Sequence, residues 1–318
     1  MTVGEIPVDD RTVRRPGWRD RLARSDVLHD FMRDPAAIVA ASILLLFAVA
    51  SLAPQIVAPY DAFDPNQFRL TDAFLAPVWL EGGDPRFLLG TDDQGRDMIS
   101  AIIFGARVSL FVGLAGVLLA VLIGVAAGLV AGFVGGWVDA VTMRVADIQL
   151  TFPAILIAVM VDGVSRAAFG QADHNQVAVA VLVLAIGLSG WVQYARPVRG
   201  ATLVERNREY VAAATMMGIA KWAIMLKHIL PNVMTSVLVI GTIHLAVAVI
   251  LEATLSFVGL GVPPTEPSLG TLIRIGNGYL FSGEWWIAIV PGCVLVILVL
   301  SINLLGDFLR DALNPRLK

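Results

Sequence analysis

The chain has 318 residues, of which 57% are hydrophobic and 15% are charged, and its net charge is -3 at pH 7. Soluble domains carry about 25% charged residues, so this composition excludes an ordinary soluble protein. The small net charge also argues against a nucleic-acid binder. With one cysteine, Cys293, the chain cannot form an intrachain disulfide.

Six segments are apolar enough to cross a bilayer, which takes about 20 residues in a helix. Residues 1–34 lack the apolar core of a signal peptide, and we expect the first apolar run, at 35–60, to be an uncleaved anchor. The third run is the shortest, and Arg144 and Asp147 lie near its start. We therefore predict an all-α membrane protein with about six transmembrane helices. The spans are Pro35–Tyr60, Val108–Val138, Ile148–Val161, His174–Ala195, Ile229–Leu251 and Trp285–Gly306.

Two long segments between the spans have the composition of loops. Residues 61–103 are rich in Pro, Gly and Asp, and we expect a loop with a short helix at its end. Residues 259–283 contain Pro263, Pro264 and Pro267 and are also predicted to be a loop.

Glycines recur inside the second span at a helical spacing. Gly124, Gly128 and Gly132 are four residues apart, which places them on one face of a helix. Small residues let transmembrane helices approach closely, so this face is predicted to be a packing seam.

Basic residues are distributed unevenly between the two sides that six spans would create. Seven arginines precede the first span, and 17 of the 23 basic residues fall on the same side as this N-terminal segment. The positive-inside rule places that side in the cytoplasm. The N- and C-termini are therefore predicted to be cytoplasmic, and the N-terminal arginines to contact lipid rather than nucleic acid.

The cytoplasmic segment 205–232 is predicted to form a helix, a tight turn and a second helix. The first helix carries the small residues Ala212 and Ala213, which would let another protein pack closely against it. Gly218 suits the left-handed end of a helix, and Pro231 suits the first turn of the next span.

This segment resembles the EAA loop of ABC importer permeases. The positions that follow its pattern are Glu209, Ala212, Ala213, Gly218, Leu230 and Pro231, and His228 and Asn232 suit the peptide-transporter branch. The chain departs from the usual first triplet, because Tyr210 and Val211 separate Glu209 from the alanines. Three further segments resemble that branch, and the resemblance covers most of 34–318. They are Leu89–Asp97 with Gly105–Leu110, Glu252–Val262, and Gly306–Arg316.

The resemblance implies a type I ABC importer (MetI-like) permease fold in the bacterial inner membrane, with its core at 104–308 and a cytoplasmic tail at 309–318. It further implies a second homologous permease, two cytoplasmic ATPases and an extracytoplasmic substrate-binding protein as partners, with 205–232 as the loop that couples to an ATPase. The chain lacks the G-x-x-x-x-G-K-[ST] motif, so ATP and magnesium are expected on the partner ATPases. No cofactor, metal site or enzymatic activity is expected in this chain.

Polar residues within or beside spans are candidates for function, because they are costly in a bilayer. Arg144 and Asp147 are predicted to form a salt bridge, since they are three residues apart. Other polar positions are predicted either to line a path or to make contacts between helices. They are Asp147, Gln149, Gln193, Thr242, His244 and Glu252.

Two other functions fit parts of the sequence. Gly187–Gly190 matches the G-x-S-G of intramembrane serine proteases, with Ser189 as nucleophile and His244 as base. A secondary transporter or channel that works alone would explain the spans but not the segment 205–232. The motifs leave the substrate open among peptides, nickel complexes, opines, glutathione and oligosaccharides.

Overall fold

The computed structural model describes residues 26–62, 64 and 66–312. The described part of the chain is helical and contains no β-strand, although an isolated bridge joins Thr91 and Asp97. Six of the seven N-terminal arginines, together with Arg316 and Lys318, lie outside the described residues. The predicted lipid contacts of this N-terminal cluster therefore stay a prediction.

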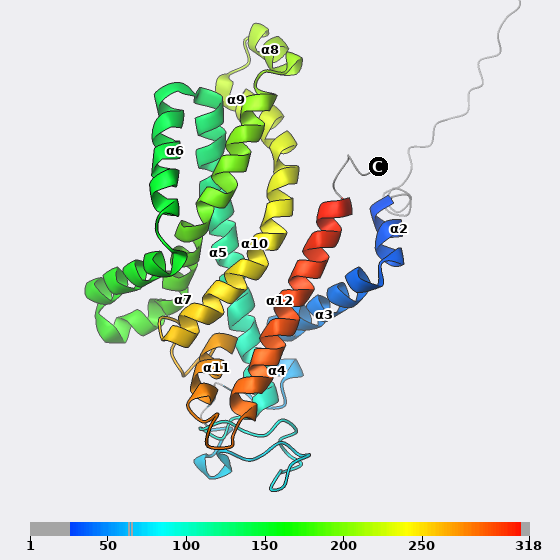
Figure 1. Ribbon diagram of the computed structural model, residues 1–318, viewed down its shortest axis with the longest axis vertical. Helices are drawn as coiled ribbons and strands as arrows, with labels where there is room; N and C mark the ends of the chain where they lie inside the picture. Colours follow the sequence, from blue (N-terminus) through cyan, green and yellow to red (C-terminus); the bar gives the residue numbers. More distant parts are fainter. Residues whose placement is uncertain (1–25, 63, 65, 313–318) are drawn as a thin grey trace, which may run out of the picture.

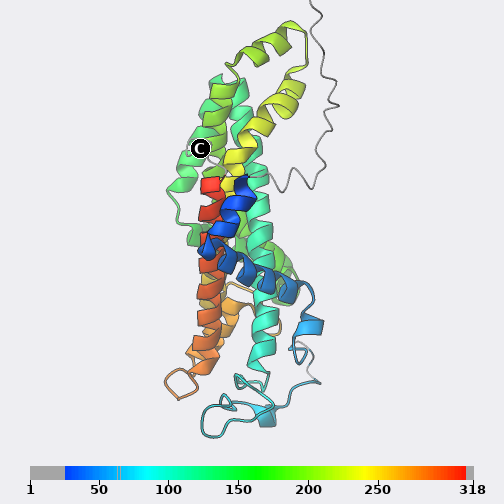
Figure 2. The ribbon, with the colours of Figure 1, turned by 90° about the vertical axis from the view of Figure 1, so that its right-hand side faces the viewer.

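The helices form an elongated bundle (Figure 1), which Figure 2 shows from the side. Helix α8 lies at one end, which we call the α8 end, and the described residues between 58 and 97 lie at the other, which we call the loop end. In chain order the elements are α2 (Asp26–Arg33), α3 (Pro35–Leu52), α4 (Pro54–Val57), η1 (Leu70–Asp72), α5 (Met98–Val134), α6 (Gly136–Leu150), α7 (Ala154–Glu205), α8 (Glu209–Met216), α9 (Lys221–Ile224), the π-helix η2 (Met225–Ile229), α10 (Leu230–Val258), α11 (Leu269–Asn277) and α12 (Trp286–Ala312).

Five helical segments of the described chain are long and apolar enough to cross a membrane. They are Pro35–Leu52, Met98–Val134, Val177–Glu205, Lys221–Val258 and Trp286–Ala312. A sixth crossing arises if the bent pair of α6 and the first part of α7 is counted as one span. The predicted number of about six therefore agrees with the structure.

The predicted third span, Ile148–Val161, is not a continuous helix. The chain breaks between Leu150 and Ala154, and the helices on either side meet at 94°. Pro153 explains the break, because proline has no N–H to donate and disfavours a helical conformation in the residue before it. A second kink follows at Gly170, whose φ is 71°. The first stretch of α7 thus runs outward from the bundle before the chain turns back (Figure 1).

Helices α5 and α7 pack closely along a seam, which we call the α5–α7 seam, and it confirms the predicted role of the three glycines. A Cβ atom on Gly124 would lie 2.3 Å from the carbonyl oxygen of Trp191, and one on Gly128 would lie 2.4 Å from that of Ala195. A Cβ on Gly132 would lie 2.8 Å from the carbonyl oxygen of Arg199. Only glycine leaves room for the two backbones to approach this closely.

The loop end is more ordered than its composition predicts. The segment 259–283, predicted to be a loop, contains α11, whose first turn is capped by the Ser268 hydroxyl. Leu269 and Leu272 are fully buried, and this burial stabilises the helix. The three prolines just before it made the segment resemble a loop in the sequence. The short helix predicted at the end of 61–103 is the first turns of α5, which Asp97 caps by accepting from the backbone N–H of Ser100 at 2.8 Å.

A buried ion pair joins the two segments of the loop end. Arg96 donates from Nε to Asp92 at 2.6 Å and from Nη1 to the carbonyl oxygen of Pro264 at 3.1 Å. Both charged side chains are buried. Removing either partner would leave a buried charge without compensation, so the pair positions 92–97 against the connection before α11.

Candidate functional site

The helix, turn and helix predicted at 205–232 are present at the α8 end. Val211 and Ala214 face inward and pack on the core, whereas Ala212 and Ala213 are exposed on the other face of α8. The predicted strip of small residues is therefore available to another protein.

The turn after α8 is closed by two backbone hydrogen bonds. The N–H of Gly218 donates to the carbonyl of Thr215 at 3.0 Å, and the N–H of Ile219 donates to that of Ala214 at 3.1 Å. Gly218 has a φ of 74°, which places it in the left-handed region, as predicted. This pattern is a Schellman motif, in which glycine is favoured because a side chain strains the left-handed conformation.

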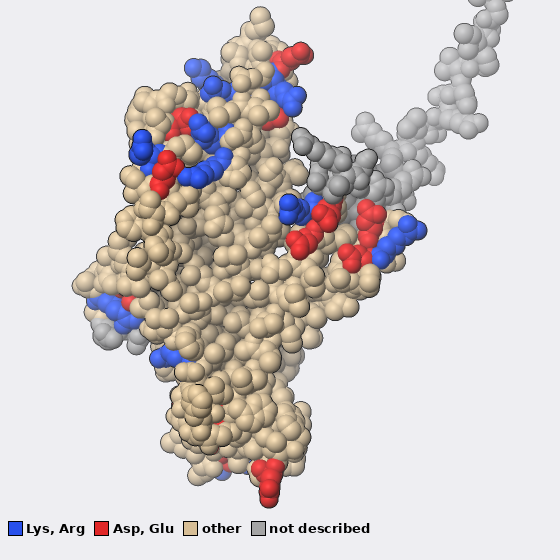
Figure 3. All heavy atoms as spheres, viewed as in Figure 1, with Lys and Arg blue, Asp and Glu red and all other residues tan. Residues whose placement is uncertain are grey.

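Apolar side chains surround this turn and point into solvent. Met216 is 90% exposed and Trp222 is 63% exposed, and Met217 and Leu226 are exposed as well. We call these four residues the apolar tip. Figure 3 shows that charged side chains on this face of the molecule gather mostly toward the α8 end, so the apolar tip stands beyond the apolar belt of the bundle. An apolar patch in such a polar setting is typical of a protein-binding surface.

A small polar network ties α8 to the following span. The Tyr210 hydroxyl donates to Glu205 Oε2 at 2.8 Å and accepts from Asn232 Nδ2 at 3.2 Å. Asn232 Nδ2 also donates to the carbonyl of His228 at 3.0 Å. Burial raises the pKa of Tyr210, and its bond to Glu205 raises it further. The network brings the predicted His228 and Asn232 together with the start of α8.

The second helix of this segment differs from its prediction. A short helix and a separate span were expected, but α9, the π-helix η2 and α10 follow one another without a break from Lys221. Pro231 lies in the first turn of α10, as predicted, and directly follows η2 and Leu230. A π-turn carries one extra residue, which accommodates the carbonyl that a proline leaves without a donor.

Asp147 does not pair with Arg144, so the predicted salt bridge within one helix is wrong. Arg196 Nη2 of α7 instead donates to Asp147 Oδ1 at 2.5 Å, across the packed helices α6 and α7. Gln149 also bridges α6 to α7, since it accepts from the indole N–H of Trp191 and donates to the carbonyl of Leu188. Gln193 lies on an exposed face of α7.

The three remaining polar candidates lie in helix contacts. His244 is buried and its Nδ1 lies 2.9 Å from the hydroxyl of Tyr194 on α7. Thr242 donates to the carbonyl of Val239 at 2.9 Å and lies against Gly306 of α12. Glu252 is fully buried, and its Oε1 accepts from Ser256 at 2.7 Å. His244 and Thr242 thus contact other helices of the chain, and whether any of these residues lines a path stays a prediction.

The predicted protease pair is not assembled. Ser189 Oγ donates to the carbonyl of Ile186 at 3.0 Å, within its own helix. His244 packs against the adjacent Gly190, but its recorded side-chain partner is Tyr194. Between these two described residues the structure records no hydrogen bond, so nothing activates the serine.

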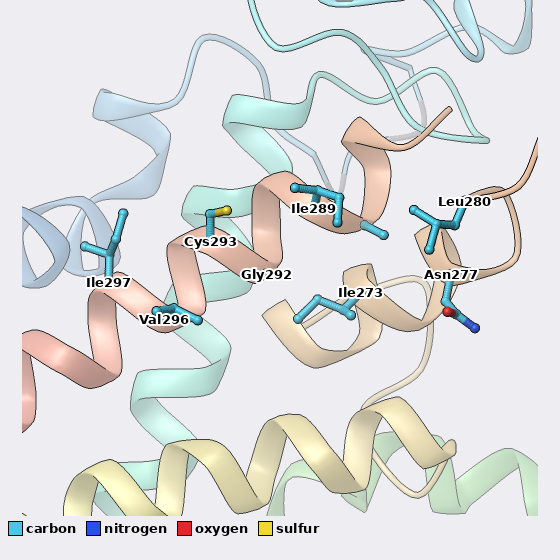
Figure 4. A pocket seen from close by; sticks show the side chains of 9 residues that line it. Ile273, Asn277, Leu280, Ile289, Gly292, Cys293, Val296 and Ile297 are labelled. Carbon is cyan, nitrogen blue, oxygen red and sulfur yellow. The ribbon is translucent and has the colours of Figure 1, made fainter. Parts of the chain in front are cut away.

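Helices α11 and α12 border an apolar groove with a volume of about 550 Å³. Figure 4 shows Ile289, Cys293 and Ile297 along α12, with Ile273 on α11 across from them. The groove contains the single cysteine of the chain, in an exposed position. Its lining is apolar, which suits contact with a second membrane-embedded surface.

Comparison with known proteins identifies the family. Residues 120–318 match the family model described as binding-protein-dependent transport system inner membrane component. The chain is 37% identical over 288 residues to the dipeptide transport system permease protein DppC of Haemophilus influenzae, covering 91% of this chain and 93% of that protein. The chain belongs to this permease family. It is also 36% identical over 314 residues to the glutathione transport system permease protein GsiD of Pectobacterium atrosepticum, covering 98% and 95% of the two proteins.

Solved structures agree with this assignment at the level of the fold. A chain of the inward-facing MetNI methionine ABC transporter aligns with a TM-score of 0.52 and 24% identity, covering 68% of this chain and 97% of that chain. The predicted MetI-like fold is thus confirmed. The protein is a permease subunit of an ABC importer in the bacterial inner membrane, and the comparisons support neither the protease nor the stand-alone transporter.

Sequence reasoning missed two features of the permease that the structure brings together. The side chains of Glu205, Tyr210 and Asn232 form one hydrogen-bonded network. Their separations in the sequence do not match the spacing of one helix face, so no periodicity indicated it. Arg196 is the partner of Asp147 from a different helix. In the sequence, Asp147 directly precedes one predicted span and Arg196 directly follows the next. Their positions at the ends of neighbouring spans were the signal that could have suggested a pair between helices.

Proposed function

We propose that this permease forms half of the path by which an ATP-driven importer carries dipeptides or similar short peptides. The relatives support this substrate class, because DppC proteins of several bacteria are named for dipeptide or di/tripeptide transport. A second homologous permease completes the path, and an extracytoplasmic binding protein delivers the peptide. The α11–α12 groove offers an apolar surface to the second permease.

The α8 end faces the cytoplasm in this proposal, together with both termini. The distribution of basic residues supports this orientation, with 17 of 23 on that side. ATP and magnesium bind to two separate ATPase subunits, since the chain lacks a phosphate-binding loop.

The apolar tip is the observation that carries the proposed coupling role. Met216, Met217, Trp222 and Leu226 project around a turn that backbone hydrogen bonds hold closed. The exposed alanines Ala212 and Ala213, with Glu209 at the start of α8, complete a small surface that fits a groove on an ATPase. The network of Tyr210 and Asn232 transmits a displacement of this surface into α10.

A bulky residue at Gly218 tests this role. No atom lies within 4 Å of a Cβ built at Gly218, so the side chain of Gly218→Trp meets no clash within the chain, although it strains the left-handed turn, and it protrudes into the docking surface. We expect dipeptide uptake into proteoliposomes containing the complete importer to fall at least about tenfold, while basal ATP hydrolysis continues. This result would mean that ATP hydrolysis continues but no longer drives transport.

The matched control is Gly283→Trp at the loop end. Gly283 also has a positive φ, of 111°, and no atom within 4 Å of its Cβ position. It reproduces the backbone strain without touching the α8 end. Normal uptake by Gly218→Trp, or equal losses in the two variants, would refute the coupling role.

A further inference from the structure

A second groove lies at the loop end, between α3 and α5, and we call it the α3–α5 groove. Its volume is about 400 Å³. The residues that line it are Ala48, Ser51, Leu52, Arg107, Leu110, Phe111, Leu114 and Leu245. It is apolar except for one guanidinium and one hydroxyl.

Arg107 lies where α5 passes from its polar end into its apolar stretch. It is nine residues after the first residue of α5, which is roughly 14 Å along the helix axis. The stretch without charged residues begins at the next residue, Val108. Arg107 therefore lies at the depth where arginine side chains extend toward the headgroups of a bilayer.

Arg107 also begins an exposed apolar stripe on α5. Phe111, Leu114, Leu118 and Leu122 follow at intervals of three or four residues, and each is more than half exposed. These residues share one face of the helix with Arg107. The guanidinium thus stands at the end of a surface suited to acyl chains.

The charge of Arg107 has no counterpart within the chain. Among the described residues the structure records no ion pair or hydrogen bond of its guanidinium, whereas Arg86, Arg96 and Arg166 each bind an aspartate. A cation at this depth without a carboxylate is complementary to an anion from outside the chain.

Ser51 supplies a second polar atom that lacks a partner in the same groove. Its hydroxyl oxygen is shielded from water and has no hydrogen-bond partner in the described part of the chain. A serine in a helix ordinarily donates to a carbonyl one turn back, as Ser42 does to Ile38 at 2.8 Å. Rotation about the Cα–Cβ bond of Ser51 would turn this unpaired hydroxyl toward a ligand in the groove.

We propose that the α3–α5 groove binds one phospholipid from the leaflet at the loop end. Its phosphate accepts hydrogen bonds from Arg107 and Ser51, and one acyl chain lies along Phe111 and Leu114. An arginine fork and a hydroxyl are donors that match phosphate oxygens, and the apolar lining matches the chain. The bound lipid fills the space between the anchor helix α3 and the permease core.

Native mass spectrometry of the full-length chain in its importer complex tests the proposal, with phosphatidylglycerol titrated into the micelles. We expect Arg107→Gln to weaken phosphatidylglycerol binding about tenfold, as the loss of charge-assisted hydrogen bonds predicts. Ser51→Ala should weaken it by a smaller factor. The control Arg86→Gln removes the same charge at the loop end, from an arginine already bound to Asp84, and should leave binding unchanged.

A photocrosslinker identifies what occupies the groove. Phe111→p-benzoylphenylalanine places the reactive group on the exposed stripe, and irradiation should add the mass of a phospholipid to the chain. Capture of a protein subunit instead would show that a partner covers the groove and would overturn the proposal. Equal phosphatidylglycerol binding by Arg107→Gln and the wild type would also overturn it.

Discussion

Glycine serves two different purposes in the α5–α7 seam and in the turn after α8. In the seam, Gly124 and Gly128 have ordinary helical backbones, but carbonyl oxygens of α7 lie within 2.3 and 2.4 Å of their Cβ positions. At Gly218 the space is open, and the left-handed φ of 74° is what favours glycine. The seam therefore has no space for a side chain, whereas the turn requires a backbone conformation that a side chain strains. The first region is built for rigidity within the chain, and the second for contact outside it.

The largest effect is expected from adding volume to the seam. Gly128→Leu forces a side chain into the carbonyl of Ala195 and the side chain of Val198, so we expect a loss of roughly 3 kcal/mol of stability. Thermal melting in detergent measures this loss. Gly200→Leu is the control, because no atom lies within 4 Å of its Cβ position on α7. Equal melting temperatures in the two variants would show that the seam tolerates volume after all.

An intermediate effect is expected in the polar network that supports the turn. Tyr210→Phe removes the hydroxyl that joins Glu205 to Asn232, so we expect local opening of α8 to become easier by about 1 kcal/mol. Hydrogen exchange of the α8 amides measures this change, with little effect on the melting of the bundle. Tyr279→Phe serves as the control, since no hydrogen bond of its hydroxyl is recorded among the described residues. If α8 exchanges equally in both variants, the network does not hold the turn.

The smallest effect is expected at the ion pair between α6 and α7. Asp147 and Arg196 are about half exposed, with side-chain exposures of 54% and 47%. We therefore expect a coupling of about 0.5 kcal/mol or less in a double-mutant cycle of Asp147→Asn and Arg196→Gln. A cycle with Arg144→Gln should give no coupling. Coupling to Arg144 instead of Arg196 would restore the salt bridge predicted within one helix.

Local patterns predicted much of the fold and the turn of the candidate site. The apolar stretches set five of the helices that are long enough to cross a membrane, because burying backbone in a bilayer requires a continuous helix. The glycine spacing at 124–132 and the glycine at 218 were also correctly interpreted, since each depends on residues close in sequence. Their chemistry is visible without knowing which other helix lies nearby.

The span predicted at 148–161 failed for a local reason, since Pro153 breaks the helix before Ala154. Other predictions failed where distant residues decide the outcome. Arg196 and Trp191 of α7 are the partners of residues on α6. Helix α11 was missed because its stability comes from burying Leu269 and Leu272 against other helices, rather than from a long apolar run. The partners of two predicted polar positions could not be read from the sequence either, since His244 meets Tyr194 of α7, and Glu252 accepts from Ser256 but keeps Oε2 without a partner among the described residues.

The sequence by itself determined that the chain crosses a membrane several times and presents a helix and a left-handed turn at one end. Hydrophobicity, helical spacing and the conformational freedom of glycine are properties of the residues themselves. Only the tertiary structure decided which polar groups meet, where Arg107 is left without a carboxylate, and which apolar side chains surround Gly218. Those outcomes depend on helices that are far apart in the chain and come together only when their faces pack.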